Sequence, residues 1–192
     1  MKTQNDLFIS LTNSALTAGA HKAAVIETKS IETDLVFREI CEKNACGGYG
    51  RCWMCPPDVG AAEKLIASIG EYDYALVYQY VGELEDSFDF EGMEDAKKLY
   101  NKVVMKMREL SANIGAKNVL NLGAGGCGVC ERCSKRDGLP CRAPELATPS
   151  LEAYCINVSK LAASAGMKYI NGANTVTYFG AVLFSFGGEE NE

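Results

Sequence analysis

Histidine is nearly absent from this chain, since His21 is the only one among 192 residues. Zinc sites of the Cys3His or Cys2His2 type and acid–base catalysis by histidine therefore have almost no residues to use. Basic residues are also few, 19 against 25 acidic residues, and the formal net charge is -6. This balance opposes general binding to nucleic acid or to an anionic membrane surface, so we expect neither as a partner.

Long apolar runs are missing as well. The most apolar stretch, VTYFGAVLFSF at residues 176–186, is far shorter than the roughly 20 residues of a membrane-spanning helix. The first residues, MKTQNDLFISLTNSA, place polar side chains where a secretory signal needs an unbroken apolar segment. We therefore expect a soluble protein of the cytoplasm.

The composition, with 47% hydrophobic and 23% charged residues, is that of a globular protein that buries a core without cross-links. Hydrophobic periodicity predicts a single α/β domain over residues 1–192, with a layered sheet of about four strands, and Asp58 as a helix N-cap. The expected helices are 7–18, 60–70, 93–114 and 149–165, and the expected strands are 22–29, 72–82, 118–122 and 175–186. Two cysteine-rich loops, 41–57 and 123–144, are expected at strand ends, where α/β sheets commonly place ligands. Residues 187–192 are expected to form a frayed tail.

Cysteine, in contrast, is abundant, with nine residues. An odd count in a chain with a core of its own argues against a disulfide scaffold, and clustered cysteines in a reducing compartment are more often metal ligands or redox groups. Eight of the nine fall into two groups of four. The first group is Cys41, Cys46, Cys52 and Cys55, and the second is Cys127, Cys130, Cys133 and Cys141. All eight are candidate metal ligands.

The second group has the spacing C-x2-C-x2-C-x7-C. Consecutive x2 intervals wrap three sulfurs around one compact object, as in the ferredoxin runs that bind a [4Fe-4S] cluster. Zinc is the runner-up, because its structural sites more typically use two separated C-x2-C pairs.

Glycines and basic residues surround the second group. Gly123, Gly125 and Gly128 formally fit the dinucleotide fingerprint G-x-G-x-x-G, but that motif must open a helix, and here its third glycine lies between two cysteines. Glycine also permits close backbone approach to a cluster. Four basic residues also lie near the second group: Arg132, Lys135, Arg136 and Arg142. Three roles are open for them: they offset the charge of a cluster, they bind an acidic partner, or they form a solvated surface of the loop.

The first group, C-x4-C-x5-C-x2-C-P-P, leaves its ligand count open. Four cysteine ligands would make a saturated cluster for electron transfer, whereas three would leave one iron with an exchangeable position. A thioredoxin-like pair, Cys52 and Cys55, is a weaker interpretation, because it leaves the other six grouped cysteines unexplained.

The remaining candidates have modest roles. Glu145, Glu152 and Asp137 lie near the second group in sequence and are possible proton donors, although such carboxylates are usually solvated. Cys155, the ninth cysteine, is expected to be a free buried thiol in a helix. Trp53 is expected to pack over the site.

The strings YGRCWMCPP at residues 49–57, CGVCERC at 127–133 and GLPCRAPELATPSLEAYCINV at 138–158 resemble a prokaryotic family of predicted metal-binding proteins of unknown function. The resemblance extends from about Val25 to Phe184. It implies metal ligation by six cysteines, while the position of Cys52 is commonly a small polar residue in the family and that of Cys155 commonly glycine. The six are Cys46, Cys55, Cys127, Cys130, Cys133 and Cys141. The spacing before Cys46 departs from the family pattern, so Cys41 rests on its place in the group.

These observations predict an iron–sulfur protein with one or two [4Fe-4S] clusters that transfers electrons in reducing metabolism, with a redox partner protein or a small-molecule substrate. Two alternatives stay open. One is an enzyme, a small-molecule reductase or desulfurase with an open iron at the first group. The other is a zinc-stabilised interaction module.

Overall fold

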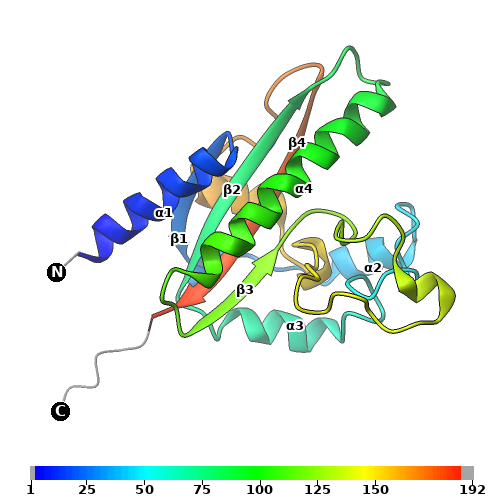
Figure 1. Cartoon of the computed structure of the whole chain (residues 1–192), viewed down its shortest axis with the longest axis horizontal. Helices are drawn as coiled ribbons and strands as arrows, with labels where there is room; N and C mark the ends of the chain where they lie inside the picture. The colour runs from blue at the N-terminus through cyan, green and yellow to red at the C-terminus, as the bar shows by residue number, and fades with distance from the viewer. Residues whose placement is uncertain (1–2, 187–192) are drawn as a thin grey trace.

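The computed structural model describes residues 3–186, which form a four-stranded antiparallel sheet with helices on both faces (Figure 1). The strand order is β1-β2-β4-β3. The strands are β1 (Lys22–Glu27), β2 (Tyr74–Glu83), β3 (Asn118–Leu122) and β4 (Thr175–Ser185). The predicted α/β class with a four-stranded sheet is confirmed, and the expected tail at residues 187–192 lies outside the described part.

The two central strands, β2 and β4, pair over their whole length, from Tyr74 opposite Phe184 to Glu83 opposite Thr175. Most residues along their middle are buried, whichever face they point to, because both faces of the sheet are covered. A strand buried on both faces has a continuous apolar run instead of a strict alternation. The sequence at both strands shows this run.

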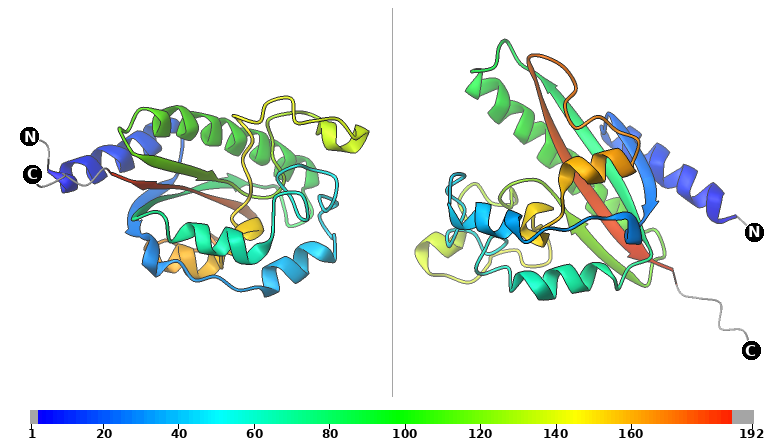
Figure 2. Two further views of the ribbon diagram at one scale, coloured as in Figure 1. Left: turned by 90° about the horizontal axis from the view of Figure 1, so that it is seen from below. Right: turned by 180° about the vertical axis from the view of Figure 1, so that it is seen from behind.

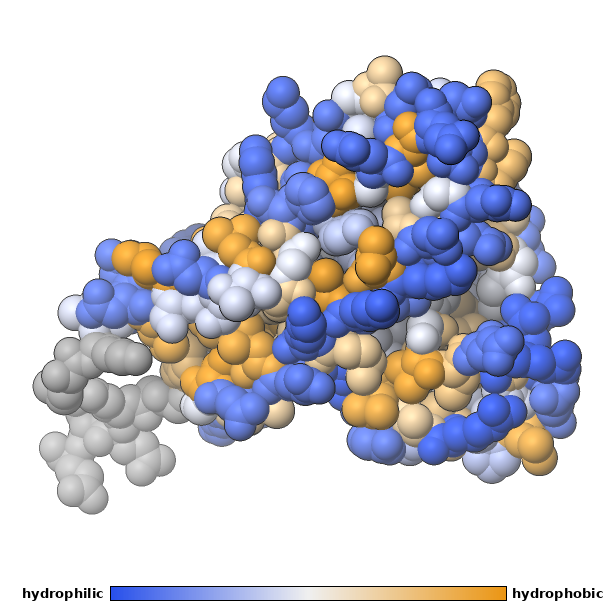
Figure 3. Space-filling model, turned by 45° about the horizontal axis from the view of Figure 1, so that its top comes forward, coloured by the Kyte–Doolittle hydropathy of each residue, from blue (hydrophilic) through white to orange (hydrophobic). Residues whose placement is uncertain are grey.

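Two layers of helices cover the sheet, as the left view of Figure 2 shows. Helices α1 (Gln4–Ala18) and α4 (Phe90–Ala112) pack on one face, where Leu11 and Met107 are buried. Helices α3 (Ala62–Ile69) and α5 (Val158–Ser164) pack on the other, where Ile69 and Leu161 are buried. On the face shown in Figure 3, polar side chains dominate and apolar ones form small separate patches. Over residues 3–186, no helix is long and apolar enough to cross a membrane.

The chain between residues 149 and 165 differs from the single predicted helix. A short 3-10 helix, η3 (Glu152–Tyr154), ends at Cys155, which has φ 58°, and α5 begins only after Asn157. The left-handed backbone at Cys155 breaks the helix, and glycine is the residue that adopts this conformation most readily.

Two further details near the first cysteine loop differ from the prediction. The short helix α2 (Val36–Glu42) was not predicted, because its seven residues are too few for the apolar positions Val36, Phe37 and Ile40 to establish a helical period. Asp58 does not cap α3, since the N-cap is Ala61, which has no capping side chain. Asp58 instead accepts a hydrogen bond from Lys135.

The two cysteine loops lie side by side at one end of the molecule (Figures 1 and 2). The second loop follows β3 directly, and a short parallel bridge between Gly123 and Ser150 fixes its start. The first loop, in contrast, lies between α2 and α3 and follows no strand. Because the sheet is antiparallel, the rule for ligands at the carboxyl ends of parallel strands does not explain this placement.

Candidate metal centre

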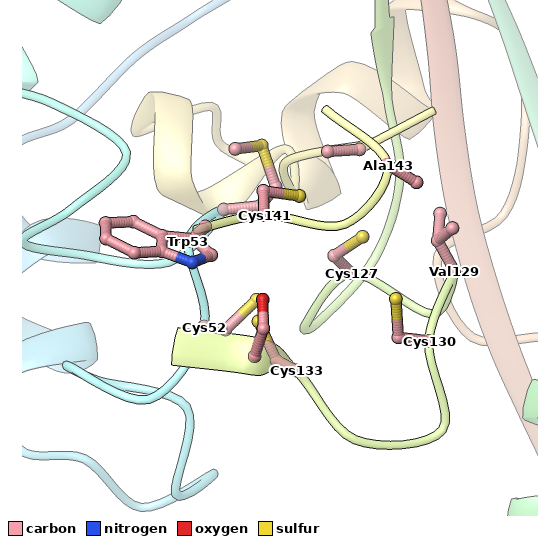
Figure 4. A pocket seen from close by; sticks show the side chains of 11 residues that line it. Cys52, Trp53, Cys127, Val129, Cys130, Cys133, Cys141 and Ala143 are labelled. Atoms are coloured by element: carbon pink, nitrogen blue, oxygen red, sulfur yellow. The ribbon is translucent and has the colours of Figure 1, made fainter. Parts of the chain in front are cut away.

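A narrow cavity at the second loop is lined by five cysteines. Four are the whole second group, Cys127, Cys130, Cys133 and Cys141, and the fifth is Cys52 of the first loop. The cavity encloses only about 20 Å³, and Trp53, Val129 and Ala143 also line it. Figure 4 shows the sulfur atoms gathered around a common space. The structure therefore brings the second group together and adds one thiol that the sequence had placed elsewhere.

Glycines let the second loop pass close to α4. A Cβ on Gly128 would lie 2.3 Å from Nδ2 of Asn101, so a larger residue would push the loop away from the helix. Gly125 has φ 64°, a conformation that favours glycine. No helix opens at the third glycine of the G-x-G-x-x-G string, because the described chain stays irregular up to the 3-10 turn η2 (Ser134–Asp137). The dinucleotide interpretation thus lacks the helix that it needs.

Polar contacts fasten the two loops together next to the narrow cavity. The indole Nε1 of Trp53 donates a hydrogen bond to the carbonyl of Leu139 at 3.0 Å. The ammonium of Lys135 contacts the Asp58 carboxylate at 2.5 Å and lies 4.3 Å from the centroid of the Trp53 ring. Trp53 is thus a packing residue that holds the first loop against the second. Lys135 stabilises this packing by contacting both Asp58 and the Trp53 ring.

A second, wider cavity is lined by the other three cysteines of the first group, Cys41, Cys46 and Cys55, together with Glu152. It has a volume of about 280 Å³. A Cβ on Gly48 would lie 3.2 Å from Sγ of Cys55 and 3.6 Å from Sγ of Cys46, so glycine leaves room exactly where the two sulfurs approach the backbone. Apolar and aromatic side chains complete the wall. They are Phe37, Ile40, Ala45, Tyr49 and Pro56.

The two cavities share a wall made from both loops. On one side of it, Cys52 lines the narrow cavity and Cys55 the wide one. On the other side, Gly125 and Gly126 line the wide cavity and the next residue, Cys127, lines the narrow one. The cavities are therefore separated by the thickness of a single chain segment.

A hydrogen bond between the thiols of Cys52 and Cys55 shifts the pKa values of both. This bond lowers the pKa of Cys52, and bonds from the backbone N–H groups of Met54 and Cys127 act in the same direction. The pKa of Cys55 is raised by the same bond and by burial. In the metal-free protein Cys52 is therefore the first of the two thiols to lose its proton, whereas Cys55 becomes a thiolate only when a bound metal favours it.

Burial raises the pKa of other thiols at the two cavities. For Cys41, burial and the neighbouring Cys46 raise the pKa, and Arg38 partly opposes them. For Cys127, burial raises the pKa and backbone hydrogen bonds partly oppose it. A bound metal ion favours deprotonation of such thiols, since the thiolate is the ligand.

Two charged side chains lie near the shared wall, and of these the sequence had marked only Glu152, as a proton donor near the second group. Lys97 of α4 donates a hydrogen bond to the carbonyl of Ala124, and burial lowers its pKa to about 8 while Glu152 and Cys127 raise it. Glu152 lines the wide cavity, and its Oε2 is buried without a hydrogen-bond partner. Its sequence position suggested the second group, whereas the fold places it beside the first. No sequence signal marks Lys97, because one lysine in an amphipathic helix looks like a surface residue.

The other candidates take structural or surface positions. His21 is exposed and accepts a hydrogen bond from the N–H of Val81 through Nδ1. Asp137 pairs with Arg132 at 2.5 Å, and Glu145 is exposed. Arg136 and Arg142 are exposed too. Cys155 is fully buried and free, as predicted, although at a left-handed turn and not in a helix.

All nine cysteines are free thiols in the described chain. As they stand, no three His, Cys, Asp or Glu side chains within residues 3–186 are arranged to hold a metal ion. The donor set nevertheless suits thiophilic metals: eight cysteine thiols line two adjoining cavities, and the Gly48 backbone leaves space for two of the sulfurs. Soft thiolates of this kind bind iron–sulfur clusters and zinc.

Comparison with known proteins gives one match, to a family of proteins. The match to the family described as "Predicted metal-binding protein (DUF2284)" covers residues 24–184, close to the range expected from the cysteine strings. No curated protein matches, and no solved structure does. Since the matched range takes in both cysteine loops and the whole sheet except the first two residues of β1 and the last residue of β4, the chain belongs to the DUF2284 family of predicted metal-binding proteins.

Proposed function

We propose that this protein binds two iron–sulfur clusters, one at each cavity, and uses them for electron transfer. The observation that carries the proposal is the meeting of all four cysteines of the second group at the narrow cavity, three of them at consecutive x2 intervals in the sequence. Such a run is typical of iron–sulfur proteins, whereas structural zinc sites more typically use two separated C-x2-C pairs. Cys127, Cys130, Cys133 and Cys141 would hold the cluster there.

At the wide cavity, Cys41, Cys46 and Cys55 would hold the other cluster. With Cys52 lining the narrow cavity, three cysteines of the first group remain. Bound clusters supply one-electron transfer, and the shared wall of Cys52, Cys55 and residues 125–127 supports exchange between neighbouring centres. Cys52 and Cys55, three residues apart on the first loop, each line one of the two cavities.

The enzyme alternative is favoured by one observation, the size of the wide cavity. A volume of about 280 Å³ exceeds what side-chain packing needs and approaches the lower end of small-molecule sites. Three cysteines leave one iron without a thiolate, and such an iron is open to substrate. The apolar walls around Phe37 and Tyr49 suit a small, largely apolar substrate, so a reductase or desulfurase is the second candidate function.

Anaerobic purification followed by iron, sulfide and zinc analysis tests the proposal. We expect brown protein with about eight iron and eight sulfide per chain, and EPR signals after reduction. Colourless protein with one or two zinc and no sulfide would refute it and favour the zinc-stabilised module.

A further inference from the structure

We infer that Glu152 is the non-cysteine ligand of the cluster at the wide cavity, so that this centre is held by Cys41, Cys46, Cys55 and one carboxylate. The inference rests on the proposed function and adds a residue to its site. It starts from position: Glu152 is the one acidic side chain among the residues that line this cavity with the three cysteines. The short 3-10 helix that begins at Glu152 is fixed beside the cavity, because the N–H of Leu151 donates to the carbonyl of Gly123 at 2.9 Å.

One oxygen of the Glu152 carboxylate has no hydrogen-bond partner. This oxygen, Oε2, is buried. An unsatisfied buried acceptor of this kind costs about 1–3 kcal/mol, and more when it is charged. A residue that only stabilised the fold would be expected to satisfy this oxygen, so its free lone pairs call for a cation or a donor in the cavity.

The groups that line the wide cavity would carry negative charge as metal ligands. Three thiolates and a carboxylate would repel one another unless a cation lay between them. Two basic side chains near the cavity donate to carbonyl groups: Arg38 donates to Gly60 and Ala153, and Lys97 donates to Ala124. Both lie close enough to affect the charges, Arg38 at Cys41 and Lys97 at Glu152, yet neither forms an ion pair with the Glu152 carboxylate. Without metal, the raised pKa values of Cys41 and Cys55 keep these thiols neutral, so a bound cation is what would stabilise three thiolates and the carboxylate together.

The chemistry of this donor set gives the site a function. A hard carboxylate oxygen binds iron less firmly than a soft thiolate and exchanges more readily. The iron beside Glu152 would thus be the one that a small molecule in the cavity reaches by displacing the carboxylate. The narrow cavity, with five thiols, has no such position.

Controlled oxidation with ferricyanide in the presence of an iron chelator tests the inference, with iron per chain and the EPR signal of a three-iron cluster followed over time. The full-length variant Glu152→Gln keeps the side-chain shape but replaces the carboxylate with a poor ligand. We expect it to lose one iron per chain at least about tenfold faster than wild type, since even residues beyond the ligands change metal affinity about 10- to 100-fold. Glu145→Gln, at an exposed carboxylate, is the matched control and should behave as wild type. Loss of iron from Glu152→Gln at the wild-type rate would overturn the inference.

A second variant decides the case in which Glu152→Gln takes up no cluster at the wide cavity. Glu152→Ala is reconstituted with and without mercaptoethanol, a small thiol that can occupy the vacant iron position. Restoration of about eight iron by the thiol supports the inference, and a failure to restore it contradicts the inference. If the proposed function itself is wrong, wild type will contain no sulfide at all, and this outcome is distinct from both.

Discussion

The narrow and the wide cavity are neighbours, but they differ in volume and in the groups that could bind a metal. The narrow one encloses about 20 Å³ among five thiols, and the wide one about 280 Å³ among three thiols and a carboxylate. A centre surrounded by sulfur is suited to electron transfer alone, whereas a centre with an oxygen ligand and free space is suited to binding a molecule. The sequence divides eight cysteines into two groups of four, whereas the fold places five of them at the narrow cavity and three at the wide one. Cys52 is the residue that changes sides.

The largest expected effect comes from removing one ligand at each cavity. Cys130→Ser should lose the cluster of the narrow cavity and Cys46→Ser that of the wide one, so each variant should retain about four of eight iron atoms. The two should lack different EPR signals. Cys155→Ala, at a buried thiol outside both cavities, is the control and should retain all the iron. If Cys130→Ser and Cys46→Ser lose the same signal, the cavities do not hold separate centres.

Cys52 gives a sharper comparison, because it is the fifth thiol of the narrow cavity. Cys52→Ser alone should leave the iron content unchanged, since four cysteines remain. Cys52 lines the same narrow cavity as Cys133, so it should also replace Cys133 as a ligand in Cys133→Ser, which should keep most of its iron. The double variant should lose about four iron atoms. Loss of the wide-cavity EPR signal from Cys52→Ser would instead return Cys52 to the first group.

Lys97 lies near both cavities, and its charge should be visible in the stability of the metal-free protein. Burial lowers its pKa from 10.5 to about 8, so the folded state binds fewer protons than the unfolded state between these values. The cost of burying the charge is complete below about pH 8 and vanishes as the pH rises to about 10.5. Relative to Lys97→Met, wild type should therefore gain up to about 3 kcal/mol of unfolding free energy over this window. Urea denaturation of both proteins at pH 7.5 and pH 10.5 measures the gain, and an equal difference at both pH values would contradict it.

The smallest effect is optical. Trp53, the only tryptophan, lines the narrow cavity, so a cluster bound there should quench its fluorescence. Reconstituted wild type and Cys46→Ser should both be strongly quenched relative to the metal-free protein, and Cys130→Ser much less. Equal quenching in the two variants would show that Trp53 does not distinguish the cavities.

Much of the fold was predictable because it depends on local patterns. The apolar run at β2, the helical spacing in α4 and Gly19 at the end of α1 each act over a few residues, and all three elements were predicted within a few positions. The exceptions have physical causes. Helix α2 has only seven residues, too few for its apolar positions to establish a helical period, and the left-handed turn at Cys155 divides one predicted helix into two elements.

The site was predictable only in part, because the spacing of cysteines along the chain does not determine which of the two cavities each side chain lines. The second group is a tight loop, and its four cysteines meet as expected. Cys52 and Cys55 are three residues apart, yet they face different cavities. Glu152 reaches the wide cavity through the bridge between Gly123 and Ser150, a contact between residues far apart in the sequence.

Mössbauer spectroscopy of the intact protein, reconstituted with 57Fe, tests the central claim that the cavities hold two centres with different ligands. The account predicts about eight iron atoms per chain in two clusters, with about one iron in eight showing parameters that a non-sulfur ligand imposes. Spectra in which every iron has four sulfur ligands would contradict the distinction between the cavities, and protein that binds no iron would contradict the account as a whole.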